Sequence, residues 1–217
     1  MQCSRCSRLV EHCRRVAAAK RRAYLDWDYW GKPVPSFGDP NARLLIVGLA
    51  PGAHGANRTG RMFTGDSSGD FLYDALYETG FASQRSATSV DDGLALNDCY
   101  IASSVRCAPP QNKPSPVEIA ACRPFLDREI RLLRRVRAVL VLGGIALNSY
   151  LALQRSRGSM FLKKDFPFRH GALHSLPSGP PLLCSYHPSQ QNTQTGRLTK
   201  PMMIRVLQLA KEIVSEH

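Results

Sequence analysis

The sequence predicts an α/β fold in which a short parallel β-sheet is covered by helices on both faces. Four short apolar runs alternate along the chain with stretches whose apolar residues recur at helical spacing. The chain has 217 residues and is 43% hydrophobic, which suffices for one domain with a substantial core. Because no internal repeat or low-complexity segment divides it, residues 1–217 are expected to form a single domain.

In the N-terminal half, the first expected element is a helix over residues 7–25. A Pro- and Gly-rich segment at 31–40, expected to be neither helix nor strand, separates this helix from the first strand, the apolar run 43–47. A second helix follows, because Ser68 can cap its start and Gly80 can close its end.

In the C-terminal half, three more apolar runs alternate with helical patterns. One helix has a clear start, because Ser115 and Glu118 form a capping box and Pro116 occupies the first helical position. The expected strands are 98–105, 138–142 and 182–186, and the expected helices begin at Ser115, Gly144 and Pro201.

Parallel strands bring the loops that follow them to one edge of the sheet, where open α/β folds bind their ligands. The loops 48–69, 106–115 and 187–200 are therefore expected to meet. The glycine-rich loop at 48–69, GLAPGAHGANRTGRMFTGDSSG, contains neither G-x-x-x-x-G-K-[ST] nor G-x-G-x-x-G. A nucleotide phosphate loop is thereby excluded.

The chain is strongly basic, with a formal net charge of +12. A charge of this size is consistent with a nucleic-acid partner and equally with a generally basic, soluble protein. The N-terminus shows no signal peptide and no apolar run is long enough to span a membrane, so a cytoplasmic location is expected.

Seven cysteines in a chain expected to be cytosolic favour metal ligation or burial over disulfides. A C-x-x-C pair near the N-terminus and a more distant pair at 107 and 122 suit zinc or an iron–sulfur cluster. Of the others, Cys99 and Cys184 lie in apolar runs and are expected in the core, and Cys13 is not expected to be a ligand.

Four motifs together identify a family. In the chain they are the N-terminal C-x-x-C, GLAPGAHGANRTGRMFTGDSSG, VRCAPPQNKPSPVE and SYHPSQQNTQTGRLT. In content and order, over nearly the whole chain, they resemble the family 5, or type b, uracil-DNA glycosylases. The resemblance implies a three-layer α/β/α sandwich with a short central parallel sheet, and a [4Fe–4S] cluster with zinc as the alternative. The matching metal ligands are Cys3, Cys6, Cys107 and Cys122.

The resemblance also implies an activity in base excision repair. A monofunctional glycosylase of this family, expected to be a monomer, flips a damaged base out of double-stranded DNA and hydrolyses its N-glycosyl bond, leaving an abasic site. Leu49, Ala50 and Ala53 stand where uracil-specific relatives carry a water-activating side chain, and Ser103 stands where a uracil-reading Asn is expected. Broad specificity for uracil and other deaminated or modified bases, including hypoxanthine, is therefore predicted.

Three residues are the catalytic candidates. Asp66 can stabilise positive charge on the sugar and orient water, or it can simply cap a helix. Asn112 can read a uracil edge or hold its own turn. His187, directly after the last predicted strand, can stabilise the departing base's oxygen anion.

The remaining candidates surround these three. Phe63 can stack on the base or pack in the core, and His54 and Asn57 can line the pocket or brace the loop. The expected base-pocket residues are Gly52, Ala53, His54 and Phe63, and the expected DNA-binding residues are Asn57, Arg58, Arg61, Gln191, Asn192 and Arg197.

Two other classes compete with a glycosylase. A non-catalytic, DNA-binding iron–sulfur protein would share the basic charge and the cysteines. A nucleotide hydrolase is disfavoured because the chain has neither a P-loop nor an acidic metal cluster.

Overall fold

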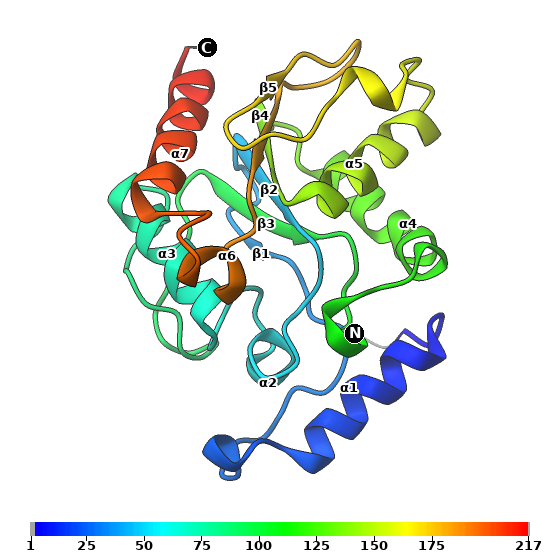
Figure 1. The fold of residues 1–217 in the computed structure, drawn as a ribbon, viewed down its shortest axis with the longest axis vertical. Helices are drawn as coiled ribbons and strands as arrows, with labels where there is room; N and C mark the ends of the chain where they lie inside the picture. Colours follow the sequence, from blue (N-terminus) through cyan, green and yellow to red (C-terminus); the bar gives the residue numbers. More distant parts are fainter. Residues whose placement is uncertain (1–2, 217) are drawn as a thin grey trace.

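A computed structural model describes residues 3–216 and has a six-stranded β-sheet at its centre (Figure 1). The predicted single domain also includes Met1, Gln2 and His217, which lie outside the described residues. Across the sheet the strands follow the order β1-β3-β2-β4-β6-β5. Their bounds are β1 (Phe37–Gly38), β2 (Leu44–Gly48), β3 (Cys99–Ser103), β4 (Ala138–Leu142), β5 (Leu173–His174) and β6 (Leu182–Ser185).

The inner strands are parallel, which confirms the predicted short parallel sheet. β2 pairs with β3 on one side and with β4 on the other, and β6 pairs with β4. The edge strands β1 and β5 pair antiparallel with β3 and β6. These edge strands are not evident in the sequence, because two residues are too few to show a strand's alternating pattern.

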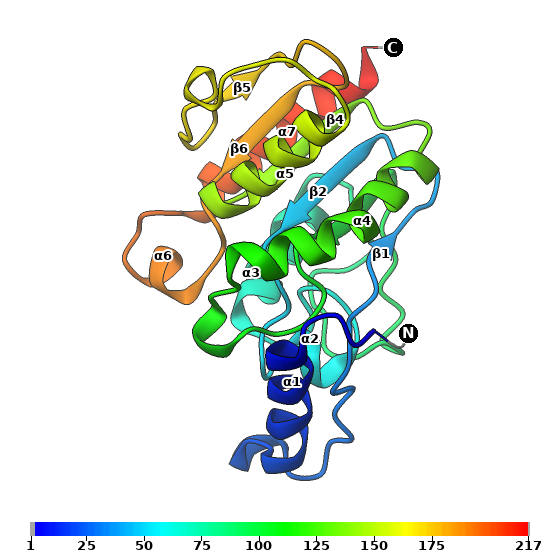
Figure 2. The ribbon, with the colours of Figure 1, turned by 90° about the vertical axis from the view of Figure 1, so that its right-hand side faces the viewer.

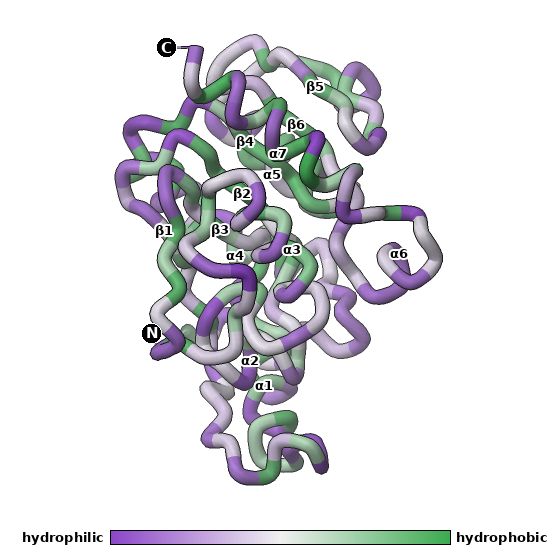
Figure 3. The backbone as a smooth tube through the Cα atoms, turned by 90° about the vertical axis from the view of Figure 1, so that its left-hand side faces the viewer, coloured by the Kyte–Doolittle hydropathy of each residue, from purple (hydrophilic) through white to green (hydrophobic). Residues whose placement is uncertain are grey.

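Helices cover both faces of the sheet, which confirms the three-layer sandwich (Figure 2). Ile46 of β2 packs in one core with α3 and α7, whereas its neighbours Leu45 and Val47 pack in another with α4 and α5. In Figure 3 the strands β2, β4 and β6 are accordingly coloured mainly as hydrophobic. The helices are α1 (Ser7–Ala19), α2 (Ala56–Thr59), α3 (Ser67–Glu78), α4 (Pro116–Leu132), α5 (Gly144–Ser156), α6 (Gln190–Gln194) and α7 (Lys200–Ser215), with short 3-10 turns at η1 (Arg22–Tyr24), η2 (Pro110–Asn112) and η3 (Lys163–Asp165).

The N-terminal helix is shorter than predicted. α1 ends at Ala19, and Lys20 has a left-handed backbone with φ 47°. The prediction of a helix over 7–25 is wrong beyond Ala19, because the run after it contains no Gly or Pro to mark a helix end. Among the described residues, no helix combines the length and the apolar character needed to cross a membrane.

α1 lies below the sandwich and is fixed to it at two places (Figures 1 and 2). Leu9 and Cys13 are fully buried against the segment 105–108, which follows β3. Arg8 donates to the Glu118 carboxylate of α4 at 2.6 Å. The N-terminal segment is therefore an integral part of the fold.

The carboxyl ends of β2 and β4 form the topological switch point of the sheet. From β2 the chain crosses to β3 on one side, and it then returns to form β4 on the other side of β2. The loops that leave these two neighbouring strands diverge there, which opens the crevice where such folds bind ligands.

Candidate active site

The Asp66 carboxylate lies in a cradle that only glycine permits. Asp66 caps α3, and its side chain accepts a hydrogen bond from the Gly69 N–H at 3.0 Å. A Cβ at Gly52 would come within 2.7 Å of Asp66 Oδ2, and one at Gly55 would overlap the carboxylate. The turn 52–55 of the glycine-rich loop thus brings its backbone against the acid.

This cradle also sets the protonation of Asp66. Burial raises its pKa above the ordinary value, although hydrogen bonds from the Gly69 and Ser68 N–H groups and the positive charge of Arg58 act in the opposite direction. A carboxylate with few water neighbours interacts strongly with any positive charge that develops beside it. Asp66 combines the capping role with chemistry suited to a cationic sugar.

Phe63 connects Asp66 with the other side of the crevice. Its backbone is left-handed with φ 53°, and it packs directly against Gly69. Its ring lies over Gly48, where an added Cβ would approach ring atoms to 3.1 Å. The ring is half-buried and its centroid is 5.9 Å from that of His187. The loops after β2 and β6 therefore meet, as predicted.

His187 is held as a neutral imidazole. Burial lowers its pKa to about 4. Its carbonyl accepts a hydrogen bond from Asn192 Nδ2 at 2.8 Å, which fixes the backbone of the residue. At neutral pH, His187 can donate a hydrogen bond from one ring nitrogen without carrying charge.

A cavity of about 260 Å³ continues from His187 to the start of α5. Gly143 caps this helix without a side-chain hydrogen bond, so the first N–H groups of α5 remain open to a ligand. Arg197 lines the same cavity, and its guanidinium lies 4.7 Å from the centre of the Tyr186 ring. A helix N-terminus and an arginine on one cavity form a surface for an anion. This anion surface was not predicted from the sequence, although the Gly143-Gly144 pair between a strand and a helix indicates an open helix N-terminus.

Asn112 lies on the neighbouring loop and is exposed. It ends the turn η2 with φ 57°, and its N–H donates to the Pro109 carbonyl at 3.1 Å. Among residues 3–216, no hydrogen bond joins its side chain to Asp66 or His187. Its reading of the base stays a prediction.

The other predicted pocket residues form the turn beside Asp66. Ala53 packs against the apolar cluster around Cys13 of α1. His54 is half-buried, and its Nδ1 lies 3.1 Å from the hydroxyl of Tyr29. Burial lowers the pKa of His54, and the positive charges of Arg21 and Arg58 lower it further. The turn is thus supported from below by the N-terminal segment.

Three residues expected at the DNA surface lie inside the protein instead. Asn57 is fully buried, and its Nδ2 is 3.4 Å from the carbonyls of both Ala53 and Cys13. Arg58 and Arg61 are each 4% exposed. Arg61 pairs with Asp92 at 2.7 Å.

This placement corrects the expectation that these three side chains line the rim. Polar residues in a loop after a strand need not face solvent when other segments supply their partners. Gln191 and Arg197 are exposed as expected, and Asn192 is half-buried with its amide bonded to the His187 carbonyl.

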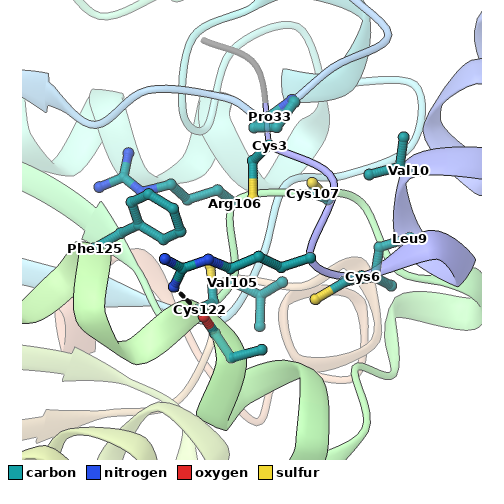
Figure 4. Close-up of a pocket in the computed structure, with 12 residues that line it drawn as sticks. Cys3, Cys6, Leu9, Val10, Pro33, Val105, Arg106, Cys107, Cys122 and Phe125 are labelled. Carbon is teal, nitrogen blue, oxygen red and sulfur yellow. Dashed lines mark hydrogen bonds between the residues drawn. The ribbon is translucent and has the colours of Figure 1, made fainter.

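The four candidate metal ligands come together from three segments. Cys3 and Cys6 precede α1, Cys107 follows β3 and Cys122 lies on α4, and all four line one cavity (Figure 4). Among residues 3–216, no three His, Cys, Asp or Glu side chains are close enough to share a single metal ion. Four thiols spread around one cavity fit the donor set of a four-iron cluster, which spaces its ligands more widely than one ion does. As predicted, Cys99 and Cys184 are fully buried in the core.

Comparison with known proteins identifies the family to which the chain belongs. The model of the uracil DNA glycosylase superfamily matches residues 35–211. The chain is 51% identical to the type-5 uracil-DNA glycosylase of Thermus thermophilus over 97% of this chain and 93% of that protein. It is 49% identical to the type-5 uracil-DNA glycosylase of Mycobacterium leprae over 97% of this chain and 91% of that protein. With the type-5 uracil-DNA glycosylase of Pyrobaculum aerophilum it shares 42% identity over 97% of this chain and 88% of that protein.

These matches confirm the resemblance drawn from the four motifs. The match to the superfamily model extends over the switch-point crevice, Asp66 and His187. The chain belongs to the uracil DNA glycosylase superfamily and, within it, to the type-5 uracil-DNA glycosylases.

Proposed function

We propose that this protein removes uracil and other deaminated or modified bases, including hypoxanthine, from double-stranded DNA by hydrolysing the N-glycosyl bond. One observation carries the proposal. The ring of Phe63 lies beside the neutral His187, while its backbone packs on Gly69, whose N–H donates to Asp66. Phe63 thus contacts both the neutral donor His187 and the residue that donates to the Asp66 carboxylate, at the carboxyl edge of the sheet.

Each group has a role in the hydrolysis. A base flipped from the stack would lie against the Phe63 ring. As the C–N bond lengthens, positive charge develops on the sugar and negative charge on the base. The Asp66 carboxylate stabilises the sugar cation and orients the attacking water, while the His187 imidazole donates a hydrogen bond to the base oxygen that gains charge. A hydrogen bond from a neutral ring, without proton transfer, adds no positive charge that would oppose the forming cation.

The flanking duplex would occupy the surface around this crevice. The first N–H groups of α5 and the guanidinium of Arg197 offer sites for backbone phosphates. Gln191 is exposed on α6, where it can enter the space that the flipped base leaves. Such contacts position DNA without reading its sequence.

Broad base specificity follows from how few polar groups read the base. The side chain of Ser103 is buried, and its hydroxyl donates to the Val105 carbonyl at 2.8 Å. This donor is already used within the protein. Ala53 and Leu49 offer no polar atoms in their side chains, so shape and stacking contribute more to recognition than hydrogen bonds do.

The reaction is expected to stop at the abasic site. A lyase forms a Schiff base with the sugar through a lysine amine. Among the described residues, no lysine lines the cavity beside His187. Strand breakage should therefore require added alkali.

We also propose that Cys3, Cys6, Cys107 and Cys122 hold a [4Fe–4S] cluster. When bound, such a cluster would join the segment before α1 to β3 and α4 through its iron–thiolate bonds. The four thiols already surround one cavity, which supports a structural role. A brown protein with iron and acid-labile sulfide would agree with this assignment, whereas a colourless protein containing one zinc ion would overturn it.

The test of the activity uses end-labelled duplexes that carry a single uracil, hypoxanthine or normal base. We expect alkali-dependent cleavage at uracil and hypoxanthine and none at the normal base. Binding without cleavage on any duplex would instead support a non-catalytic DNA-binding protein. Cleavage at uracil alone would keep the activity and remove the claim of broad specificity.

A further inference from the structure

Arg58 is a buried cation that forms no ion pair with a carboxylate in the described part of the chain. Two aromatic rings enclose it instead. Its guanidinium carbon lies 3.9 Å from the ring centre of Tyr24 and 4.0 Å from that of Trp27. Stacking between two rings is a favourable environment for a guanidinium and leaves its edge free to donate hydrogen bonds.

The edge of this guanidinium joins two points of the glycine-rich loop. Nε donates to the His54 carbonyl at 2.8 Å, and Nη2 donates to the Gly65 carbonyl at 2.7 Å. His54 directly precedes Gly55, and Gly65 directly precedes Asp66. One rigid, planar group therefore spans the two backbone positions that form the Asp66 cradle.

The glycine-rich loop leaves room for the contact between Arg58 and the Gly65 carbonyl. Gly65 has φ 79°, and a Cβ there would overlap Arg58 Nη2. Hydrogen bonds also hold the segment that carries the two rings. The Trp27 N–H donates to the Tyr24 carbonyl at 3.2 Å, and three residues later the Trp30 N–H donates to the Arg58 carbonyl at 2.9 Å. The hydroxyl of Tyr29, in the same segment, lies 3.1 Å from His54 Nδ1.

We propose that Arg58, enclosed by Tyr24 and Trp27, is a positioning residue that holds the Asp66 carboxylate at its catalytic place. Tyr24 and Trp27 precede residue 35, where the match to the superfamily begins. The N-terminal segment then supports catalysis indirectly. It holds Arg58, which positions Asp66, and it does not touch the base. This inference rests on the proposed glycosylase function.

The alternative is that the stack merely adds to overall stability. The two cases differ in what they change. Misplacing Asp66 slows the chemical step on bound DNA, because a shift of about 1 Å in a catalytic group can cost about 100-fold in rate. Loss of stability alone lowers the melting temperature and leaves the rate of the folded enzyme unchanged.

The test compares single-turnover excision of uracil, at saturating enzyme, with the dissociation constant for the same duplex. Arg58→Lys keeps the charge but loses the rigid, planar fork that spans the two carbonyls, and we expect its excision rate to fall about 100-fold. Trp27→Leu removes one ring from a half-exposed position, and we expect a loss of about tenfold that Trp27→Phe largely restores. DNA dissociation constants should stay within about threefold, since the phosphate contacts are untouched.

Arg43→Lys is the matched control. Arg43 donates to Asp98 at 2.8 Å and to the Val214 carbonyl at 2.9 Å, at the edge of the sheet remote from the crevice. This variant should lose thermal stability and keep the wild-type excision rate.

Wild-type activity separates the two possible failures. If the wild-type protein does not excise uracil, the proposed function fails. If it does, and the variants Arg58→Lys and Trp27→Leu excise at wild-type rates despite lower melting temperatures, the positioning role is overturned.

Discussion

Replacing Asp66 by Asn separates catalysis from stability in this enzyme. The substitution removes the anion that would stabilise the sugar cation. Loss of one pre-organised electrostatic group of this kind costs about 10²–10³ in rate, or about 3–4 kcal/mol. The helix cap should survive, because Asn caps helix N-termini about as well as Asp does and can still accept from the Gly69 N–H. Asp66→Ala should slow excision by the same factor as Asp66→Asn and should, in addition, lower the stability of the fold by about 1 kcal/mol through loss of the helix cap.

The pH dependence of stability shows whether Asp66→Asn should raise or lower the melting temperature. Burial raises the pKa of Asp66 above its ordinary value of 3.8, so the folded protein holds the proton more tightly than the unfolded chain does. The stability that this proton contributes is fully present below the unfolded pKa and is lost as the pH rises through the folded pKa. At neutral pH the charged Asp66 therefore destabilises the fold, and Asp66→Asn should match or exceed the wild-type melting temperature.

The assay is thermal unfolding of the wild-type, Asp66→Asn and Asp66→Ala proteins at neutral pH and near pH 4.5, together with single-turnover excision. We expect the advantage of Asp66→Asn over the wild type to shrink at the lower pH. A variant that excises uracil at the wild-type rate would remove Asp66 from the chemistry. An Asp66→Asn protein as unstable as Asp66→Ala would refute the account of capping and burial.

Four further predictions follow from the same geometry. Because burial lowers the pKa of His187 to about 4, the pH–rate profile should show no acidic limb near the ordinary value of 6.5, and an inflection there that disappears in His187→Gln would contradict a neutral His187. Gly55→Ala should abolish excision, since its Cβ would overlap the Asp66 carboxylate, and full activity would disprove the cradle. Arg197→Gln should weaken duplex binding and reduce the slope of log affinity against log salt by about one, whereas an unchanged slope would exclude a phosphate contact. Cys107→Ser should lose iron and lower the melting temperature, as measured by metal analysis and calorimetry, and full iron content would contradict its role as a ligand.

Much of the fold was predictable because its signals are local. The capping box at Ser115–Glu118 and the strand 138–142 both depend on residues adjacent in sequence, and both appear in the structure where expected. The meeting of the loops after β2 and β6 followed from the parallel topology alone. Phe63 and His187 are neighbours for that reason.

The burial of Arg58 and Arg61 could not be predicted in the same way. Arg58 is covered by Tyr24 and Trp27, which lie more than 30 residues earlier, and Arg61 pairs with Asp92, which lies 31 residues later. A basic side chain in a loop has the same local pattern whether it faces DNA or an aromatic ring. Only the tertiary structure decides between the two.

The most direct test of the central claim is to detect the released base itself. Duplexes with one uracil are incubated under single-turnover conditions with the wild-type protein or with Asp66→Asn, and free uracil is quantified by mass spectrometry while strand integrity is followed without alkali. We expect stoichiometric free uracil and intact strands with the wild type, and about 10²–10³-fold slower release with Asp66→Asn at equal DNA binding. Equal release by both proteins, or release only together with strand cleavage, would contradict this expectation.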